Sequence, residues 1–243
     1  MNNLIEEFVT EFNKTFIRDN RYVVFLEGFR NTMVITVFAV IIGMVLGTVV
    51  SLVHALALDA QKKKRKTFRT ELVLILDKIC TVYVAIMRGT PLAIQLTIMS
   101  FIIMAGYSNK ILVCCVAFGI NSGAYVSEVI RGGIGAVDIG QTEAGRSLGL
   151  SSLATLRLIV LPQAVKSILP ALCNEGIAVL KETAIVGLIS VVDLTRASDL
   201  VRSRTLSPYF PLLSVAAVYF VLVAGLSALV SRLERKLKAS DRS

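Results

Sequence analysis

The sequence predicts an all-α, polytopic membrane protein with about five transmembrane helices and a helical loop on the cytoplasmic side. Hydrophobic residues make up 55% of the 243 residues and charged residues only 18%, whereas soluble domains carry about 25% charge. Several apolar stretches reach the ~20 residues that a helix needs to cross a bilayer. The basic residues lie at the ends of these stretches, where they set the orientation of the chain.

Composition also excludes several classes of protein. The formal net charge of +9 would suit nucleic-acid binding in a soluble chain, but basic residues at the ends of apolar runs serve topology instead, so no nucleic-acid partner is expected. The four cysteines lie in or beside apolar segments without metal-ligand spacing, which favours small core residues and predicts no metal site. The acidic start, with Glu6, Glu7 and Glu11, does not resemble a cleaved signal peptide.

The amino-terminal third predicts one surface segment and one span. Residues 1–28 mix apolar positions with both charge signs, as in an amphipathic extracytoplasmic segment at the membrane surface, although a partly ordered tail has the same composition. A first span follows, from Phe29 or Thr32 to about residue 58. Gly43 and Gly47 share one face of it and allow close helix contact. His54 is interpreted as a helix-end or interfacial residue.

The basic run at residues 61–69 assigns that loop to the cytoplasm and the amino terminus to the outside. Residues 71–87 carry three charges and predict an inclined helix that leads into a second span, 91–105. A third span, 111–130, returns inward. The following ranges predict, in order, a cytoplasmic loop, a fourth span, an outer loop, a last span and a basic cytoplasmic tail: 131–166, 168–192, 193–208, 211–230 and 232–243. We therefore expect one transmembrane domain, residues 29–231, without an internal repeat.

The central loop contains the most informative stretch, EAGRSLGLSSLATLRLIVLP, residues 143–162. Its pattern predicts a short helix, a left-handed stop at Gly149, a serine cap and a second helix that Pro162 interrupts. The spacing of Glu143, Gly149 and Pro162 resembles the EAA loop of permease subunits in ATP-binding-cassette (ABC) importers. The resemblance implies that this loop couples to an ATPase through Glu143, Ala144, Gly145, Arg146 and Gly149. Gly145 stands where the family usually has alanine.

Other motifs extend the resemblance over most of the chain. RGTPLAIQL, GAYVSEVIRGGI, LPQAVKSILPAL and LKETAIVGLI are similar to the branch of these importers that takes up polar amino acids of the histidine, glutamine and arginine type. One departure is Ala184, where related sequences often carry serine.

The resemblance implies a pore-forming permease subunit that couples ATP hydrolysis on partner chains to alternating-access uptake of polar amino acids. Its partners would be a second permease subunit, identical or similar, two cytoplasmic ATP-binding subunits, an extracytoplasmic solute-binding protein and membrane lipid. This chain would bind no cofactor, and ATP with Mg²⁺ would bind to the ATPase subunits. The location would be the bacterial inner membrane, with the amino terminus outside and the carboxyl terminus in the cytoplasm.

Polar residues within the spans are candidates for the solute pathway: Gln95, Asn121, Ser122, Lys181, Glu182 and Thr183. Such residues in a span face the bundle or a water-filled cavity, but helix-to-helix bonding accounts for them equally well, and both interpretations stay open. For Glu128 and Arg131, three residues apart, we favour a local ion pair over contact with solute.

The sequence lacks the motifs that would make the chain an enzyme. It contains no GxxxxGK[ST] phosphate loop and no serine–histidine–acid set, and it has a single histidine. No catalytic residue is therefore expected. Two alternatives to the importer subunit remain: a self-sufficient secondary carrier or channel, which Lys181 and Glu182 would favour, and a membrane-anchored receptor or scaffold without transport. The carrier or channel leaves the EAA-like loop unexplained, whereas the receptor or scaffold needs only the spans and a docking loop.

Overall fold

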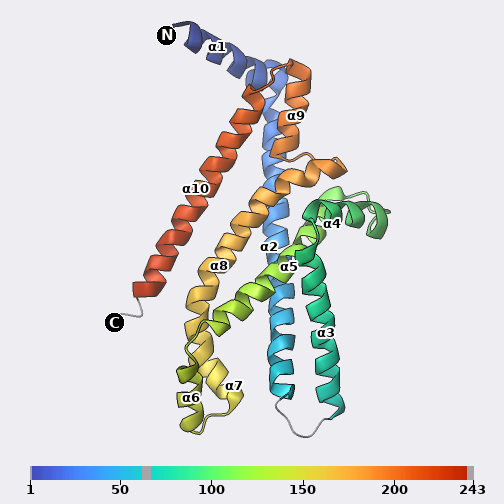
Figure 1. Cartoon of the computed structure of the whole chain (residues 1–243). Helices are drawn as coiled ribbons and strands as arrows, with labels where there is room; N and C mark the ends of the chain where they lie inside the picture. The colour runs from blue at the N-terminus through green and yellow to red at the C-terminus, as the bar shows by residue number, and fades with distance from the viewer. Residues whose placement is uncertain (1, 62–66, 240–243) are drawn as a thin grey trace. The chain divides into compact units, whose positions relative to one another are not determined.

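The computed structural model describes residues 2–61 and 67–239, and these residues form an all-helical chain without strands, which confirms the predicted class. The basic residues 62–66 and the last four of the tail lie outside the described residues. Figure 1 labels the α-helices. In the text, η marks the short π-helical or 3₁₀ segments between them. The elements are α1 Asn2–Phe12, η1 Asn13–Ile17, η2 Arg18–Asn20, α2 Tyr22–Gln61, α3 Phe68–Gly89, α4 Leu92–Ile98, η3 Met99–Ile103, α5 Lys110–Gly135, α6 Ile139–Ser147, α7 Ser152–Thr155, η4 Leu156–Val160, α8 Leu161–Glu182, η5 Thr183–Ile189, α9 Leu194–Thr205 and α10 Phe210–Ala239.

Four helical stretches of the described chain are long and apolar enough to cross a membrane: Tyr22–Gln61, Lys110–Gly135, Ser152–Ile189 and Phe210–Leu237. The fifth predicted span corresponds to a shorter apolar helix, Leu92–Ile103. The helix that was expected to start near residue 168 begins at Ser152 instead, because Pro162 does not interrupt it. Pro162 follows the π-helical turn η4, where the backbone hydrogen-bond ladder is already altered and one missing N–H is tolerated.

The chain divides into two compact units, each made of three segments. Unit 1 comprises Met1–Ala39, Leu92–Phe118 and Ile177–Leu226, and unit 2 comprises Val40–Pro91, Gly119–Gly176 and Ser227–Ser243.

In unit 1, α9 packs on the amino-terminal part of α2, beside which it lies in Figure 1. The core of this packing is a buried cluster of Phe25, Leu194, Ala197, Val201 and Val215. The amide of Asn31 donates to the carbonyl of Val192 at 2.8 Å, and the hydroxyl of Thr32 accepts from the N–H of Leu194 at 3.4 Å.

Asp193 begins α9 as a fully buried amino-terminal cap. Its carboxylate accepts the backbone N–H groups of Thr195 and Arg196, both at 2.9 Å. Burial raises the pKa of Asp193, and these N–H groups oppose the rise. A Cβ added at Gly28 would lie 2.6 Å from the carbonyl oxygen of Asp193, so the two backbones touch. These contacts fix α9 to α2.

In unit 2, α2 and α5 approach closely through glycine, as the sequence predicts. A Cβ at Gly43 would lie 2.8 Å from the hydroxyl of Ser122, and one at Gly47 would lie 2.5 Å from Val126. Glycines on one helix therefore face residues of the same spacing on the other, which allows close packing without a hydrophobic driving force.

Replacing Gly47 should consequently destabilise unit 2. We expect Gly47→Leu to lower the free energy of unfolding by about 2 kcal/mol, because the added side chain meets Val126 and the carbonyl of Gly123. The matched control is Gly132→Leu, since a Cβ at Gly132 meets no heavy atom within 4 Å. The fraction of monodisperse protein that survives heating in detergent measures the difference. Equal melting of both variants would contradict this packing.

Candidate functional site

The predicted coupling segment forms a compact turn in unit 2. Asp138 caps the start of α6, and its carboxylate accepts the N–H of Gly140 at 2.6 Å. The helix ends at Ser147, and Gly149 follows with the left-handed φ of +83° that the sequence predicts. Arg146 closes the turn by donating to the carbonyl of Leu150 at 2.8 Å. Ser151 then caps α7 by accepting from the N–H of Ala154 at 3.2 Å. These bonds satisfy some of the backbone groups that the helix ends leave free.

The two faces of α6 differ. Gly145 is buried, and a Cβ there would lie 2.8 Å from both Thr155 and Ile159, so α6 packs on α7 and η4 through this residue. In Figure 1, α6 and α7 lie side by side at the start of α8. The other predicted coupling residues, Glu143, Ala144, Arg146 and Gly149, are exposed. Glycine at position 145 is thus a packing residue, and the other four predicted coupling residues stay exposed.

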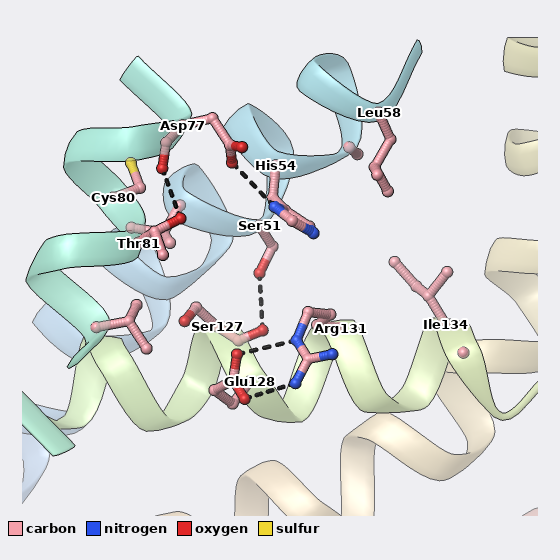
Figure 2. A pocket seen from close by; sticks show the side chains of 14 residues that line it. Ser51, His54, Leu58, Asp77, Cys80, Thr81, Ser127, Glu128, Arg131 and Ile134 are labelled. Carbon is pink, nitrogen blue, oxygen red and sulfur yellow. Dashed lines mark hydrogen bonds and ion pairs between the residues drawn. The ribbon is translucent and has the colours of Figure 1, made fainter. Parts of the chain in front are cut away.

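A second site in unit 2 is a cavity of about 520 Å³ between α2, α3 and α5. Figure 2 shows the polar side chains that face it. His54 Nδ1 and Asp77 Oδ1 are 2.9 Å apart, and Ser51 donates to the carbonyl of Ser127 at 3.2 Å. The cavity is lined by Val50, Ser51, His54, Ala55, Leu58, Asp77, Cys80, Thr81, Val84, Ser127, Glu128, Arg131, Ile134 and Gly135.

Glu128 binds two arginines at the edge of this cavity. Arg131 donates to both of its carboxylate oxygens, at 2.9 and 2.7 Å, which confirms the predicted local pair. Arg88 also donates, at 2.8 Å, and lies over the ring of Tyr125 at 5.5 Å. A carboxylate held by a bidentate arginine and a second guanidinium is strongly oriented. The result is a cluster of charges of both signs facing a space of small-molecule size.

The six predicted pathway residues do not line this cavity. Gln95, Lys181, Glu182 and Thr183 belong to unit 1, and Asn121 and Ser122 belong to unit 2. Thr183 is buried and donates to the carbonyl of Leu180, and Lys181 is exposed. Among the described residues, Lys181 and Glu182 form no ion pair, so the predicted alternative of mutual pairing is not seen.

The two residues in unit 2 make helix-to-helix bonds. The amide of Asn121 donates to the carbonyl of Met87 at 3.2 Å, and Ser122 donates to the carboxylate of Glu175 at 2.9 Å. Both are buried. A role of the six residues in the pathway stays a prediction.

The sequence does not predict a site role for His54 and Asp77, which line the cavity, or for Arg88, which binds Glu128 at its edge. His54 lies on the cavity wall seven residues before α2 ends and pairs with Asp77, so the interpretation of a helix-end residue was incomplete. Arg88 belongs to the RGTP motif, but its partner is 40 residues away in the chain. The sequence does indicate that charged residues in apolar helices need partners. It does not indicate which residue the partner is.

Comparison with known proteins shows the family of the chain. Residues 72–239, more than half of the chain, match the family described as "Binding-protein-dependent transport system inner membrane component". The chain belongs to this family and is a membrane-embedded permease subunit of an ABC transporter.

Two named relatives and one solved structure are similar over most of their length. The arginine transport system permease protein ArtQ of Bacillus subtilis is 39% identical over 89% of this chain and 93% of its own. The glutamine transport system permease protein GlnP of Escherichia coli K12 is 32% identical over 68% of this chain and 77% of its own. A crystal structure of an amino acid ABC transporter with histidines matches with a TM-score of 0.77 and 36% identity, covering 88% of this chain and 94% of that one. These comparisons lend no support to a self-sufficient carrier.

Proposed function

We propose that the chain is the pore-forming subunit of an importer of polar amino acids. It would work with a second permease subunit, identical or similar, two cytoplasmic ATPases that bind ATP and Mg²⁺, and an extracytoplasmic solute-binding protein. The chain itself would bind no cofactor. The observation that carries the proposal is α6, which is fixed to α7 through Gly145 and exposes Glu143 and Arg146. The named relatives support the choice of solute.

The proposed orientation places the amino terminus outside and α6 in the cytoplasm. It rests on the positive-inside rule applied to the run at residues 61–69 and to the tail. In this orientation the exposed face of α6 meets an ATPase, and closure of the ATPase dimer would move α8 through α7 and η4. An exposed helix mounted on a continuous transmembrane helix is suited to transmit such a rigid-body movement.

The cavity in unit 2 supports a zwitterionic solute. Asp77 and Glu128 offer negative charge for an α-ammonium group, and Arg131 offers positive charge for an α-carboxylate. Charges inside a protein cavity act more strongly on a solute of opposite charge than the same charges in bulk water. A volume of about 520 Å³ lies within the range of small-molecule sites.

Co-purification and transport together test this function. A tagged chain expressed in its own cell should co-purify with a chain that carries a phosphate-binding loop. Liposomes that contain both chains should take up a radiolabelled amino acid only when ATP and the binding protein are both present. Solute flux by the chain alone in ATP-free liposomes would refute the proposal. Liposomes that contain the ATPase alone give the background.

A further inference from the structure

α9 in unit 1 is amphipathic, and its apolar side is already occupied. Leu194, Ala197 and Val201 are buried in the core of the unit. Outside this buried face the helix exposes three arginines, Arg196, Arg202 and Arg204. Asp199 is the one acidic residue of the helix and pairs with Arg202 at 3.1 Å. Three arginines against one aspartate give the helix a net charge of +2.

Within the part of the chain that the structure describes, two of these arginines have no acidic partner. Among the described residues, Arg196 and Arg204 form no ion pair, although the nearby α1 carries three glutamates. Glu11 of α1 accepts a hydrogen bond from Ser207 instead. The exposed side of α9 is therefore a cationic surface that the fold does not neutralise.

Two exposed side chains lie at and just beyond the carboxyl end of α9. Leu206 is left-handed, with φ 52° and ψ 23°, and 85% exposed. Glycine is the usual residue at such a helix end, since a side chain there is strained. Tyr209 follows and is 71% exposed. Tyrosine and arginine are the residue types that contribute most often to the energy of protein interfaces.

This surface is also held rigidly. The contacts of Asp193 with Gly28, of Asn31 with Val192 and of Thr32 with Leu194 fix the start of α9 to α2. A rigid surface loses little conformational entropy when it binds, so more of the contact energy appears as affinity.

We propose that the outer surface of α9, formed by Arg196, Arg202, Arg204, Leu206 and Tyr209, docks an acidic face of the solute-binding protein. The inference rests on the proposed function, which supplies the partner and places α9 outside the cell. Charge complementarity selects the acidic face. Lipid is the poorer match, because a helix that lies in a membrane needs an exposed apolar face. Among the described residues α1 has that face, with Ile5, Phe8, Val9 and Phe12 exposed, whereas the apolar face of α9 is buried.

The test uses the complete transporter, with its ATPase, in nanodiscs of phosphatidylcholine, and measures ATPase rate against the concentration of its binding protein. We expect Arg202→Glu with Arg204→Glu to raise the half-saturating concentration at least tenfold and to flatten its dependence on salt. The matched control, Arg18→Glu with Arg30→Glu, reverses two exposed charges of unit 1 outside α9 and should leave that concentration within twofold.

Leu206→Gly separates docking from folding. Glycine relieves the left-handed strain, so the melting temperature should hold or rise, yet the loss of the side chain should raise the half-saturating concentration about threefold. In a background without the four native cysteines, Ser203→Cys should react with an impermeant thiol reagent added outside intact cells. Protection of that cysteine would overturn the proposal.

The remaining outcomes are also decisive. If the binding protein stimulates the wild-type transporter and the α9 variants respond identically, the docking surface is refuted and the importer function stands. If the variants change ATPase rate only in nanodiscs with phosphatidylglycerol, at unchanged half-saturation, the surface binds lipid and the proposal fails. If the wild-type transporter shows no ATP-driven uptake, the proposed function itself fails.

Discussion

Glu143→Lys should abolish ATP-driven uptake while the protein reaches the membrane in near-normal amount. Glu143 is exposed on α6, so its replacement should change the free energy of unfolding by no more than about 0.5 kcal/mol. In a small docking contact, loss of a charged anchor costs ~2 kcal/mol or more of binding free energy, which exceeds a tenfold loss of affinity. Solute uptake and ATPase stimulation by the loaded binding protein measure the effect. The same charge reversal at Glu7, exposed on α1, should leave both intact.

Gly149 provides an independent check on the same turn. Gly149→Pro should also uncouple, because proline fixes φ near −65° and cannot adopt the +83° of this helix end. Gly149→Asn is the control, since asparagine tolerates the left-handed region and a Cβ there meets nothing within 4 Å. Uptake at the wild-type rate by both Glu143→Lys and Gly149→Pro would remove α6 from the coupling mechanism.

Glu128→Ala should cause a large loss of stability in unit 2. It removes three hydrogen bonds and leaves Arg88 and Arg131 facing each other without a carboxylate. Because Glu128 is only partly exposed, at 27%, we expect the free energy of unfolding to fall by about 2 kcal/mol.

An exposed pair of similar length is the control for this substitution. Asp199→Ala breaks the contact with Arg202, whose side chain is 49% exposed, and should cost less than about 0.5 kcal/mol. Heating each variant in detergent and measuring the folded fraction by size-exclusion chromatography compares them. If both variants melt together, the Glu128 cluster does not stabilise unit 2.

Local rules predicted the parts of the fold that depend on neighbouring residues. Gly149 and Ser151 were assigned correctly because a left-handed stop and a serine cap are decided within one turn of helix. The glycine contact of α2 was predicted from spacing alone. The prediction that Pro162 interrupts the helix is wrong. A π-helical turn accommodates the proline, and the spacing of apolar residues does not reveal such a turn.

The residues of the cavity could not be predicted in the same way. Arg88 and Glu128 are both visible as charges in apolar stretches, but their pairing depends on how α3 packs against α5. The same holds for His54 and Asp77, which lie on different helices. The sequence cannot show whether a buried amide such as that of Asn121 binds solute or a neighbouring backbone. In the structure, the amide of Asn121 binds the backbone.

The glycine contact between α2 and α5 also limits how this chain can evolve. Gly43 and Gly47 must face Ser122 and Val126 at the same time. Between the two glycines, Met44 and Val45 are exposed and are free to drift among apolar residues. Inserting or deleting one residue there would instead rotate one glycine away from α5 by about 100°. Evolution can therefore replace exposed residues between the two glycines but cannot change the number of residues that separates them.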